Sequence, residues 1–167
     1  MHTMQKNAHS GSVNMLTKHL YWLLIPTVLI VLCDEWLKRI GLTRLPQEGS
    51  LIHPGIVDFA IHKNFGIAFD IPFKLGWVIL ISIGIGLGLV KVAYKHWSDR
   101  PGITFATLMI MTGALGNLYD RVTYGFTVDY IILFGRSAIN LSDAIIVLGV
   151  FLLLVTSQRK KLTENHR

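Results

Sequence analysis

The segment TVDYIILFGRSAINLSD, residues 127–143, carries two aspartates beside apolar stretches long enough to enter a lipid bilayer. A carboxylate at this depth is costly and is usually retained for function. Two carboxyl groups held close in a poorly hydrated place tend to share a proton, so that the ionised one can take a proton from water while the neutral one donates to a carbonyl oxygen. The pattern therefore favours acid–base hydrolysis by a pair of aspartates.

A second group of polar residues precedes this segment. Asn117, Asp120 and Arg121 stand at i, i+3 and i+4, which is one face of a helix. Asp120 is therefore a second candidate partner for Asp143, and spacing alone does not choose between it and Asp129. The neighbours on the face of Asp120 favour a fixed, ionised, structural role for it.

Other polar residues have structural interpretations. Asp34 and Lys38 form an i,i+4 pair with the acid first, which is the better orientation, and they are interpreted first as an ion pair that anchors a helix end. Asn140, Ser142 and Asp143 are all residue types that can cap a helix N-terminus. Capping explains one of them, but it does not explain why acids from three separate segments are expected at one level.

Four apolar blocks must position these residues. Each can approach the roughly 20 residues that a membrane-spanning helix requires. We expect one integral membrane domain over 1–167, with an all-α membrane core of four transmembrane helices. The predicted spans are about 19–38, 74–95, 103–120 and 141–157. In the second block, Gly84 and Gly88 form a small-xxx-small pattern, which predicts close helix packing there.

Composition supports a membrane protein. Hydrophobic residues make up 51% of the 167 residues, charged residues only 16%, and the mean hydropathy is +0.49. The net charge of +6 could suggest nucleic acid, but the basic residues flank the apolar blocks as membrane orientation signals do. The single cysteine, Cys33, excludes an intrachain disulfide. A metal site is not expected, because no metal-ligand spacing accompanies the histidines.

Orientation follows from the basic flanks KVAYKHWSDR and QRKK, which place both termini in the cytoplasm. The predicted cytoplasmic tail is about 1–18, and the predicted outer loops are about 39–73 and 121–140. The first outer loop contains Asn64 and an alternating stretch from Gly55 to Phe73, which indicates short strands on the membrane surface.

Four ordered blocks resemble the signal peptidase II family of bacterial lipoprotein signal peptidases. DEWLK at 34–38 is similar to the family's D-Q-x-x-K, and NFGIAF at 64–69 fits N-x-G-x-A-F. GALGNLYDR at 113–121 fits G-x-x-G-N-x-x-D-R, while VDY and NLSD resemble V-V-D-F and F-N-x-A-D. The resemblance extends from about Leu20 to Ser157.

The resemblance implies a membrane aspartyl endopeptidase of the bacterial inner membrane, with a small extracytoplasmic β-cradle and its active site near the outer face. It would cut prolipoproteins before the diacylglyceryl-modified cysteine, as a monomer in membrane lipid, without metal or cofactor. The implied catalytic pair is Asp129 and Asp143. The implied supporting residues are Asp34, Lys38, Asn64, Gly66, Asn117, Asp120, Arg121 and Asn140.

The chain departs from the family pattern at several positions. Glu35 replaces glutamine, Thr127 replaces the first valine, Ile139 replaces phenylalanine and Ser142 replaces alanine, and the stretch from 129 to 143 is shorter than the family pattern predicts. Ser142 is expected to add a hydrogen bond to the neighbouring aspartate. Two other functions stay open at this point: a membrane carrier that binds a proton or cation, and a relative that binds lipoproteins without cutting them.

Overall fold

The computed structural model describes residues 22–50, 55–66 and 74–164, with side chains through residue 158. The predicted tail at 1–18 and the start of the predicted first span lie outside the described residues. Parts of the first predicted outer loop, 51–54 and 67–73, lie outside them as well.

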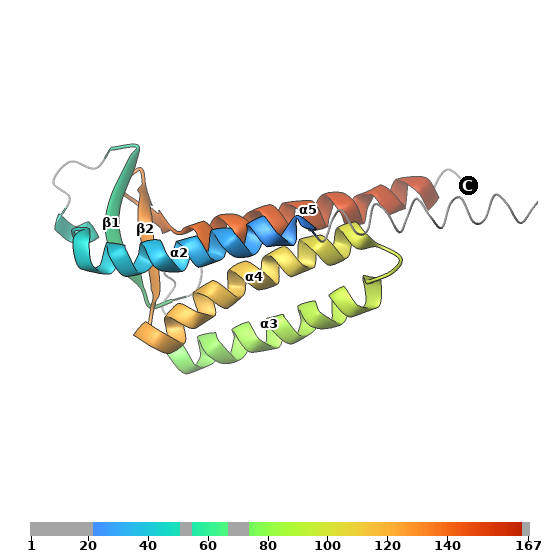
Figure 1. The fold of residues 1–167 in the computed structure, drawn as a ribbon, viewed down its shortest axis with the longest axis horizontal. Coiled ribbons are helices and arrows are strands. Elements are labelled where there is room, and N and C mark those ends of the chain that lie inside the picture. The colour runs from blue at the N-terminus through green and yellow to red at the C-terminus, as the bar shows by residue number, and fades with distance from the viewer. Residues whose placement is uncertain (1–21, 51–54, 67–73, 165–167) are drawn as a thin grey trace, which may run out of the picture.

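Four long helices form the body of the molecule: α2 (Leu24–Arg44), α3 (Leu75–His96), α4 (Pro101–Tyr124) and α5 (Leu141–Glu164). They run side by side, and a small sheet crosses one end of the bundle (Figure 1). The helix α4 is central, since it packs against α2, α3 and α5. The turn between α3 and α4 and the described end of α5 lie at the opposite end from the sheet (Figure 1).

Three of these helices, α3, α4 and α5 through Gln158, are long and apolar enough to cross a membrane. The described part of α2 does not meet this measure, because its second half carries Asp34, Glu35, Lys38 and Arg39. The structure therefore supports a mostly helical membrane protein with three spanning helices, and it leaves the predicted fourth span open.

The sheet has three antiparallel strands in the order β1-β2-β3: β1 (Val57–Asn64), β2 (Thr127–Leu133) and β3 (Ser137–Ile139). A short 3-10 helix, η1 (Glu48–Ser50), precedes β1. His62 on β1 pairs with Asp129 on β2, and Asn64 pairs with Thr127. Gly125 ends α4 in the left-handed conformation at φ 83°, which glycine adopts without strain. This turn sends the chain from α4 directly into β2.

Two apolar clusters hold these elements together. Val31, Met109 and Ile145 form the first cluster between α2, α4 and α5. Ile61, Val128 and Tyr130 form the second, and they join the sheet to the ends of the helices. The second cluster fixes the strand that carries Asp129 against the bundle.

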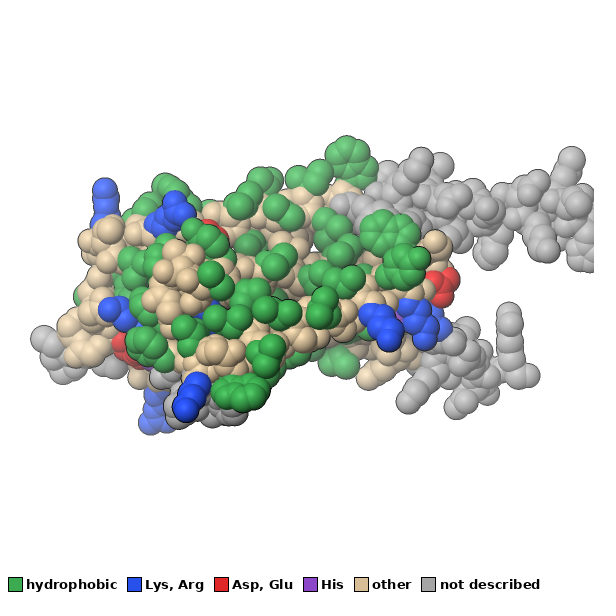
Figure 2. All heavy atoms as spheres, turned by 90° about the horizontal axis from the view of Figure 1, so that it is seen from below, with side chains coloured by type: hydrophobic (Ala, Val, Ile, Leu, Met, Phe, Trp, Pro, Cys, Tyr) green, Lys and Arg blue, Asp and Glu red, His purple; other side chains and the backbone are tan. Residues whose placement is uncertain are grey.

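The flanks of the bundle are apolar. Many large hydrophobic side chains on α2, α3 and α5 are exposed, among them Leu29 (59%), Leu87 (67%) and Val147 (67%). On the face seen in Figure 2, apolar side chains cover the side of the bundle, with lysines and arginines toward its two ends. Such a surface is suited to lipid and not to water.

Close packing by glycine occurs between α4 and α5. A Cβ at Gly113 would lie 2.6 Å from the carbonyl oxygen of Ser142, and a Cβ at Gly149 would lie 2.8 Å from Ile110 Cγ1. By contrast, nothing lies within 4 Å of a Cβ built at Gly84 or Gly88 on α3. The predicted close packing at Gly84 and Gly88 is therefore wrong, because that face of α3 has open space around it.

We expect Gly113→Ala to lower thermal stability in detergent, because the new methyl meets the α5 backbone and overpacking costs about 1–3 kcal/mol. Gly84→Ala is the matched control, since its methyl enters open space and alanine is the better helix former. Equal melting temperatures for the two variants would contradict the packing described here.

Candidate active site

The N-terminus of α5 carries a reciprocal cap. Asn140 Oδ1 accepts from the Asp143 backbone N–H at 2.9 Å, and the Asp143 carboxylate accepts from the Asn140 backbone N–H at 3.2 Å. This is the geometry of a capping box, with Asn140 as the cap. The capping interpretation is correct for Asn140, and Asp143 takes part with one carboxylate oxygen, Oδ2, while Oδ1 accepts from Asn117 Nδ2 at 2.7 Å.

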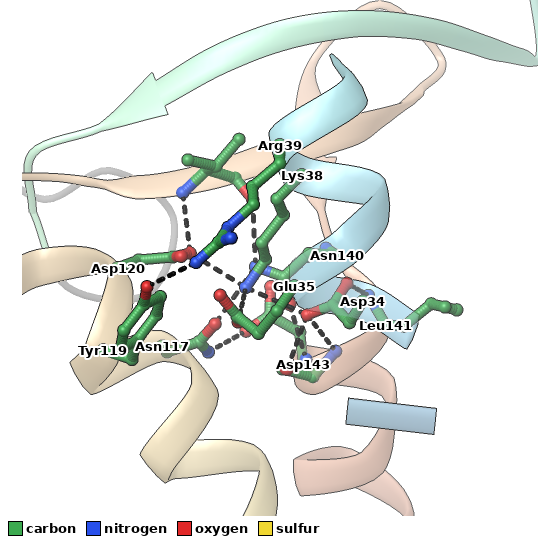
Figure 3. A network of polar contacts seen from close by, with 12 residues as sticks. Asp34, Glu35, Lys38, Arg39, Asn117, Tyr119, Asp120, Asn140, Leu141 and Asp143 are labelled. Carbon is green, nitrogen blue, oxygen red and sulfur yellow. Dashed lines mark hydrogen bonds and ion pairs between the residues drawn. The ribbon is translucent and has the colours of Figure 1, made fainter. Parts of the chain in front are cut away.

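Asn140 also joins the two predicted catalytic residues. Its side-chain amide donates to Asp129 Oδ1 at 2.7 Å and to Asn117 Oδ1 at 3.1 Å. Asn140 is fully buried and Asp129 is 1% exposed. The amide network therefore holds Asp129 on β2 and Asp143 on α5 in one cluster, with Asn117 of α4 between them (Figure 3 labels Asn117, Asn140 and Asp143).

The loop after β1 closes one side of this cluster. Asn64 Nδ2 donates to Asp129 Oδ2 at 3.1 Å, and Asn64 Oδ1 accepts from the Gly66 backbone N–H at 3.0 Å. The Gly66 carbonyl accepts from Arg121 Nη2 at 3.2 Å. Arg121 thus contacts this loop. The positive charge paired with Asp120 comes from another residue.

That residue is Lys38, whose ammonium lies 2.8 Å from Asp120 Oδ2 and 2.9 Å from Asp34 Oδ2. Lys38, Asp34 and Asp120 are all fully buried. The predicted i,i+4 pair of Asp34 and Lys38 is confirmed as a contact. Asp120 further accepts from the Val128 backbone N–H at 3.1 Å, so it is engaged away from Asp143 (Figure 3).

Asp34 ties three elements together. Its Oδ1 accepts from the Tyr130 hydroxyl at 2.9 Å and from the Leu141 backbone N–H at 3.0 Å. Its Oδ2 accepts from the Ser142 hydroxyl at 2.6 Å and from the Ser142 backbone N–H at 3.2 Å. The expected bond from the Ser142 hydroxyl to Asp143 is therefore wrong, because that hydroxyl donates to Asp34 instead.

Asp129 lies in an environment that disfavours its charge. Burial first, and the negative charge of Asp143 second, raise the pKa of Asp129 to about 7, against the lowering effect of the bonds from Asn64 and Asn140. A carboxyl group with such a pKa holds its proton through much of the neutral range. The cluster can therefore present one neutral and one ionised carboxyl group together.

A pocket of about 620 Å³ opens beside the cluster. Asp143, Asn117, Arg121 and Asn64 line its polar side. Most of its apolar lining comes from α3 and α5, with a smaller share from α4 and β3, and other lining residues are polar. The apolar residues are Val78, Ile81, Ile85, Ala114, Ala138, Ile139, Ile146 and Val147, and the other polar residues include Glu48, His62 and Arg136. The exposed flanks of Ile81, Ile85 and Val147 show that the pocket opens toward the side of the bundle.

Comparison with known proteins identifies the family. A family model described as Signal peptidase (SPase) II matches residues 26–159. The chain belongs to the signal peptidase II family. Proteins named lipoprotein signal peptidase are similar to this signal peptidase II chain. One from Ectopseudomonas mendocina is 36% identical over 81% of this chain and 86% of its own, and one from Acinetobacter baylyi is 29% identical over 89% and 87%.

A solved structure described as a bacterial membrane enzyme superposes with a TM-score of 0.73 at 26% identity, over 83% of this chain and 88% of that one. A second, described in the same way, gives a TM-score of 0.67 at 27% identity. The fold of this signal peptidase II chain is thus shared with bacterial membrane enzymes, and the chain is a bacterial integral membrane peptidase.

The structure places all ten predicted site residues at the sheet end of the bundle, in two linked groups. One group surrounds Asp129 and Asp143, and the other surrounds Lys38. Within the described residues, no group of three or more histidine, cysteine, aspartate or glutamate side chains is placed to hold a metal ion. Sequence reasoning missed Tyr130 and the partner of Ser142, and no sequence signal connects either to Asp34.

Proposed function

We propose that this chain removes signal peptides from prolipoproteins by cutting before a diacylglyceryl-modified cysteine, with Asp129 and Asp143 as the catalytic pair. The observation that carries the proposal is the bridging of both carboxyl groups by Asn140 and Asn117 at the edge of a pocket with apolar walls. The name of the relatives, lipoprotein signal peptidase, supports the substrate class.

The two carboxyl groups take different parts. Asp143 stands at the start of α5, where its two oxygens accept from the Asn117 amide and the Asn140 N–H, both donor-only groups, and it takes the proton of the attacking water. Asp129, the buried neutral partner, donates its proton to the carbonyl oxygen of the scissile peptide bond. Water adds to the carbonyl carbon to give a tetrahedral diol. As the C–N bond breaks, Asp143 passes its proton to the leaving amine of the cysteine and Asp129 takes back a hydroxyl proton, so both carboxyl groups return to their starting states. The reaction on this proposal needs neither a metal nor a cofactor.

In this proposal α2 is a fourth membrane span. Its charged residues Asp34 and Lys38 are fully buried against other elements, whereas its exposed positions before Arg39, such as Leu29, Leu32 and Trp36, are apolar. Charges that face the protein interior in pairs are compatible with a spanning helix. The domain is then one four-helix membrane unit over the whole chain.

Exposed aromatic residues mark two levels along the bundle. Trp77 begins α3 and Trp97 follows its end, 50–57% exposed and separated by about 30 Å at 1.5 Å per residue. This separation matches a hydrocarbon core of about 30 Å, with an aromatic residue at each interface. The pocket would then lie just below the interface at the sheet end.

We infer the orientation from charge. The turn between α3 and α4 is flanked by Lys91, Lys95 and Arg100. The basic stretch of sequence at the end of α5 belongs to the same end of the bundle. This end is cytoplasmic in the proposal, together with both termini, and the site faces the outer side of the inner membrane. Labelling of single cysteines at positions 99 and 136 from either side tests this orientation.

The decisive experiment incubates purified protein with a diacylglyceryl-modified prolipoprotein and follows the products by mass spectrometry. A free signal peptide and a mature chain that begins at the lipidated cysteine are expected. Binding without cleavage would leave a non-cutting relative as the function. The carrier alternative has no support in the structure, because the cytoplasmic half of α3 in this orientation, from Gly86 to Val92, is apolar apart from Lys91.

Asn64→Ala is expected to move the alkaline limb of the pH–rate profile to higher pH. Asn64 donates to the Asp129 carboxylate and thereby stabilises the charged form, so its loss raises the pKa of Asp129 above about 7. The shared proton is then lost only at higher pH. The other charges that act on Asp129 are those of Asp143, His62 and Arg121, and this substitution replaces none of them.

Lys63→Ala is the control, because Lys63 is the exposed neighbour of Asn64 on β1 and its side chain points to the other face of the strand. The limb should stay within about 0.3 pH units of wild type in this variant, since exposed charges are well screened. A limb that moves to lower pH in Asn64→Ala would contradict the role given to this amide.

A further inference from the structure

The ammonium of Lys38 is surrounded by three carboxyl groups. Its Nζ lies 2.9 Å from Asp34 Oδ2, 3.0 Å from Glu35 Oε1 and 2.8 Å from Asp120 Oδ2. The side chains of Lys38, Asp34 and Asp120 have no exposed surface, and that of Glu35 is 17% exposed (Figure 3). Three ionised carboxylates on one buried cation would leave two uncompensated negative charges, which is strongly unfavourable.

Asp34 is not the group that relieves this excess. Each of its oxygens already accepts a hydrogen bond from a backbone N–H group, which can only donate: the Leu141 N–H on Oδ1 and the Ser142 N–H on Oδ2. The Tyr130 and Ser142 hydroxyls donate to the same two oxygens. With Lys38 as a further donor, Asp34 is held as an acceptor only, which is the ionised form.

Glu35 and Asp120 differ from Asp34 in this respect. Among the described residues, Glu35 Oε2 and Asp120 Oδ1 are buried oxygens without a hydrogen-bond donor. The two carboxyl groups face the same ammonium and interact with each other. A proton on one of them would supply the missing donor and would remove one negative charge from the cluster.

Glu35 is the better holder of that proton. Asp120 accepts from both Lys38 and the Val128 backbone N–H, whereas Glu35 accepts only from Lys38 among the described residues. Residue 116 is glycine, which leaves room for the Glu35 carboxyl group, because a Cβ at this position would lie 3.2 Å from Glu35 Oε1. The nearby cation Arg39 donates to the Tyr119 hydroxyl.

We propose that Glu35 is a neutral carboxylic acid that keeps its proton and donates a hydrogen bond to Asp120, and that it acts as a positioning residue for the strand that carries Asp129. Asp120 holds the Val128 N–H at 3.1 Å, and the Val128 carbonyl accepts from Asn140 Nδ2 at 3.4 Å. Val128 directly precedes Asp129. The positioning role rests on the proposed function, but the protonation of Glu35 does not.

Infrared difference spectroscopy of wild type against Glu35→Gln tests the protonation without any substrate. The expected result is loss of a carboxylic-acid C=O band from the variant, a band that shifts in D2O. Loss of ionised-carboxylate bands with no change in the C=O region would overturn the proposal. Because no turnover is measured, this result is independent of whether the chain cuts prolipoproteins.

Cleavage assays then test the positioning role. Glu35→Gln keeps a donor and an acceptor in the same place, so it should retain kcat within about threefold, as a rescue by the conservative variant. Glu35→Met has similar length but no polar head, and its kcat should fall about tenfold or more with little change in KM, as for other groups that orient catalytic residues. Equal kcat values for the two variants, both folded by thermal melting, would overturn the positioning role.

Discussion

Asp129→Asn and Asp143→Asn should each reduce the turnover of a diacylglyceryl-modified prolipoprotein by at least about 10³-fold. General acid–base groups contribute about 10²–10⁴-fold, and a pair that shares a proton fails when either member loses its carboxyl group. The double variant should therefore be hardly slower than either single variant, because residues that act as a unit are not additive. Initial rates at saturating substrate give the comparison.

The control for this experiment is Asp99→Asn, an identical chemical change at an aspartate that is 63% exposed at the opposite end of the bundle. Its rate should equal that of wild type. Thermal melting must accompany the Asp143 variant, because Asp143 also completes the cap of α5. Turnover within about tenfold of wild type in either variant, well short of usual catalytic contributions, would remove the dyad assignment.

A prolipoprotein without its diacylglyceryl group should be cut at least about 100-fold more slowly at low substrate concentration. The pocket beside Asp143 has walls of Val78, Ile81, Ile85 and Val147 that are open toward the lipid side. Burial of about four methylene groups at 0.8 kcal/mol each contributes about 3 kcal/mol, which corresponds to roughly 100-fold. Paired kcat/KM measurements in one detergent test this expectation.

Two neighbouring residues on α5 provide the matched variants. Val147 lines the pocket, whereas Leu148 is exposed outside it. Val147→Trp narrows the pocket and should raise KM for the modified substrate, and Leu148→Trp should leave KM unchanged. Equal rates on modified and unmodified substrate would instead favour a general protease of the membrane surface.

The apolar blocks predicted most of the helical fold, because a long hydrophobic run has few other uses than to span a bilayer. The first span was harder to predict, since α2 combines an apolar half with Asp34, Glu35, Lys38 and Arg39. The strand β1 was indicated by alternation, whereas β2 and β3 lay within a stretch read only as an outer loop. The strand form of β2 depends on pairing with β1, which lies more than 60 residues away, and β3 in turn pairs with β2.

Within the site, spacing on one helix predicted local contacts correctly, as for Asp34 with Lys38. It failed for contacts between elements. Asp120 was given Arg121 as its charged neighbour, yet its ion-pair partner is Lys38 of α2. The prediction of close packing at Gly84 and Gly88 on α3 failed for a related reason. A small residue allows another helix to approach closely, but it does not determine which helix does so.

The contact between Asp34 and the start of α5 has a consequence for biosynthesis. The donors at Leu141 and Ser142 lie 107 and 108 residues after Asp34, so α2 is synthesised long before these groups that donate to its carboxylate. Asp143 also arrives with this last helix. With Asp129 and Asp143 as the proposed catalytic pair, the chain is an incomplete enzyme during translation, and we expect peptidase activity only once α5 has packed beside α2 and α4.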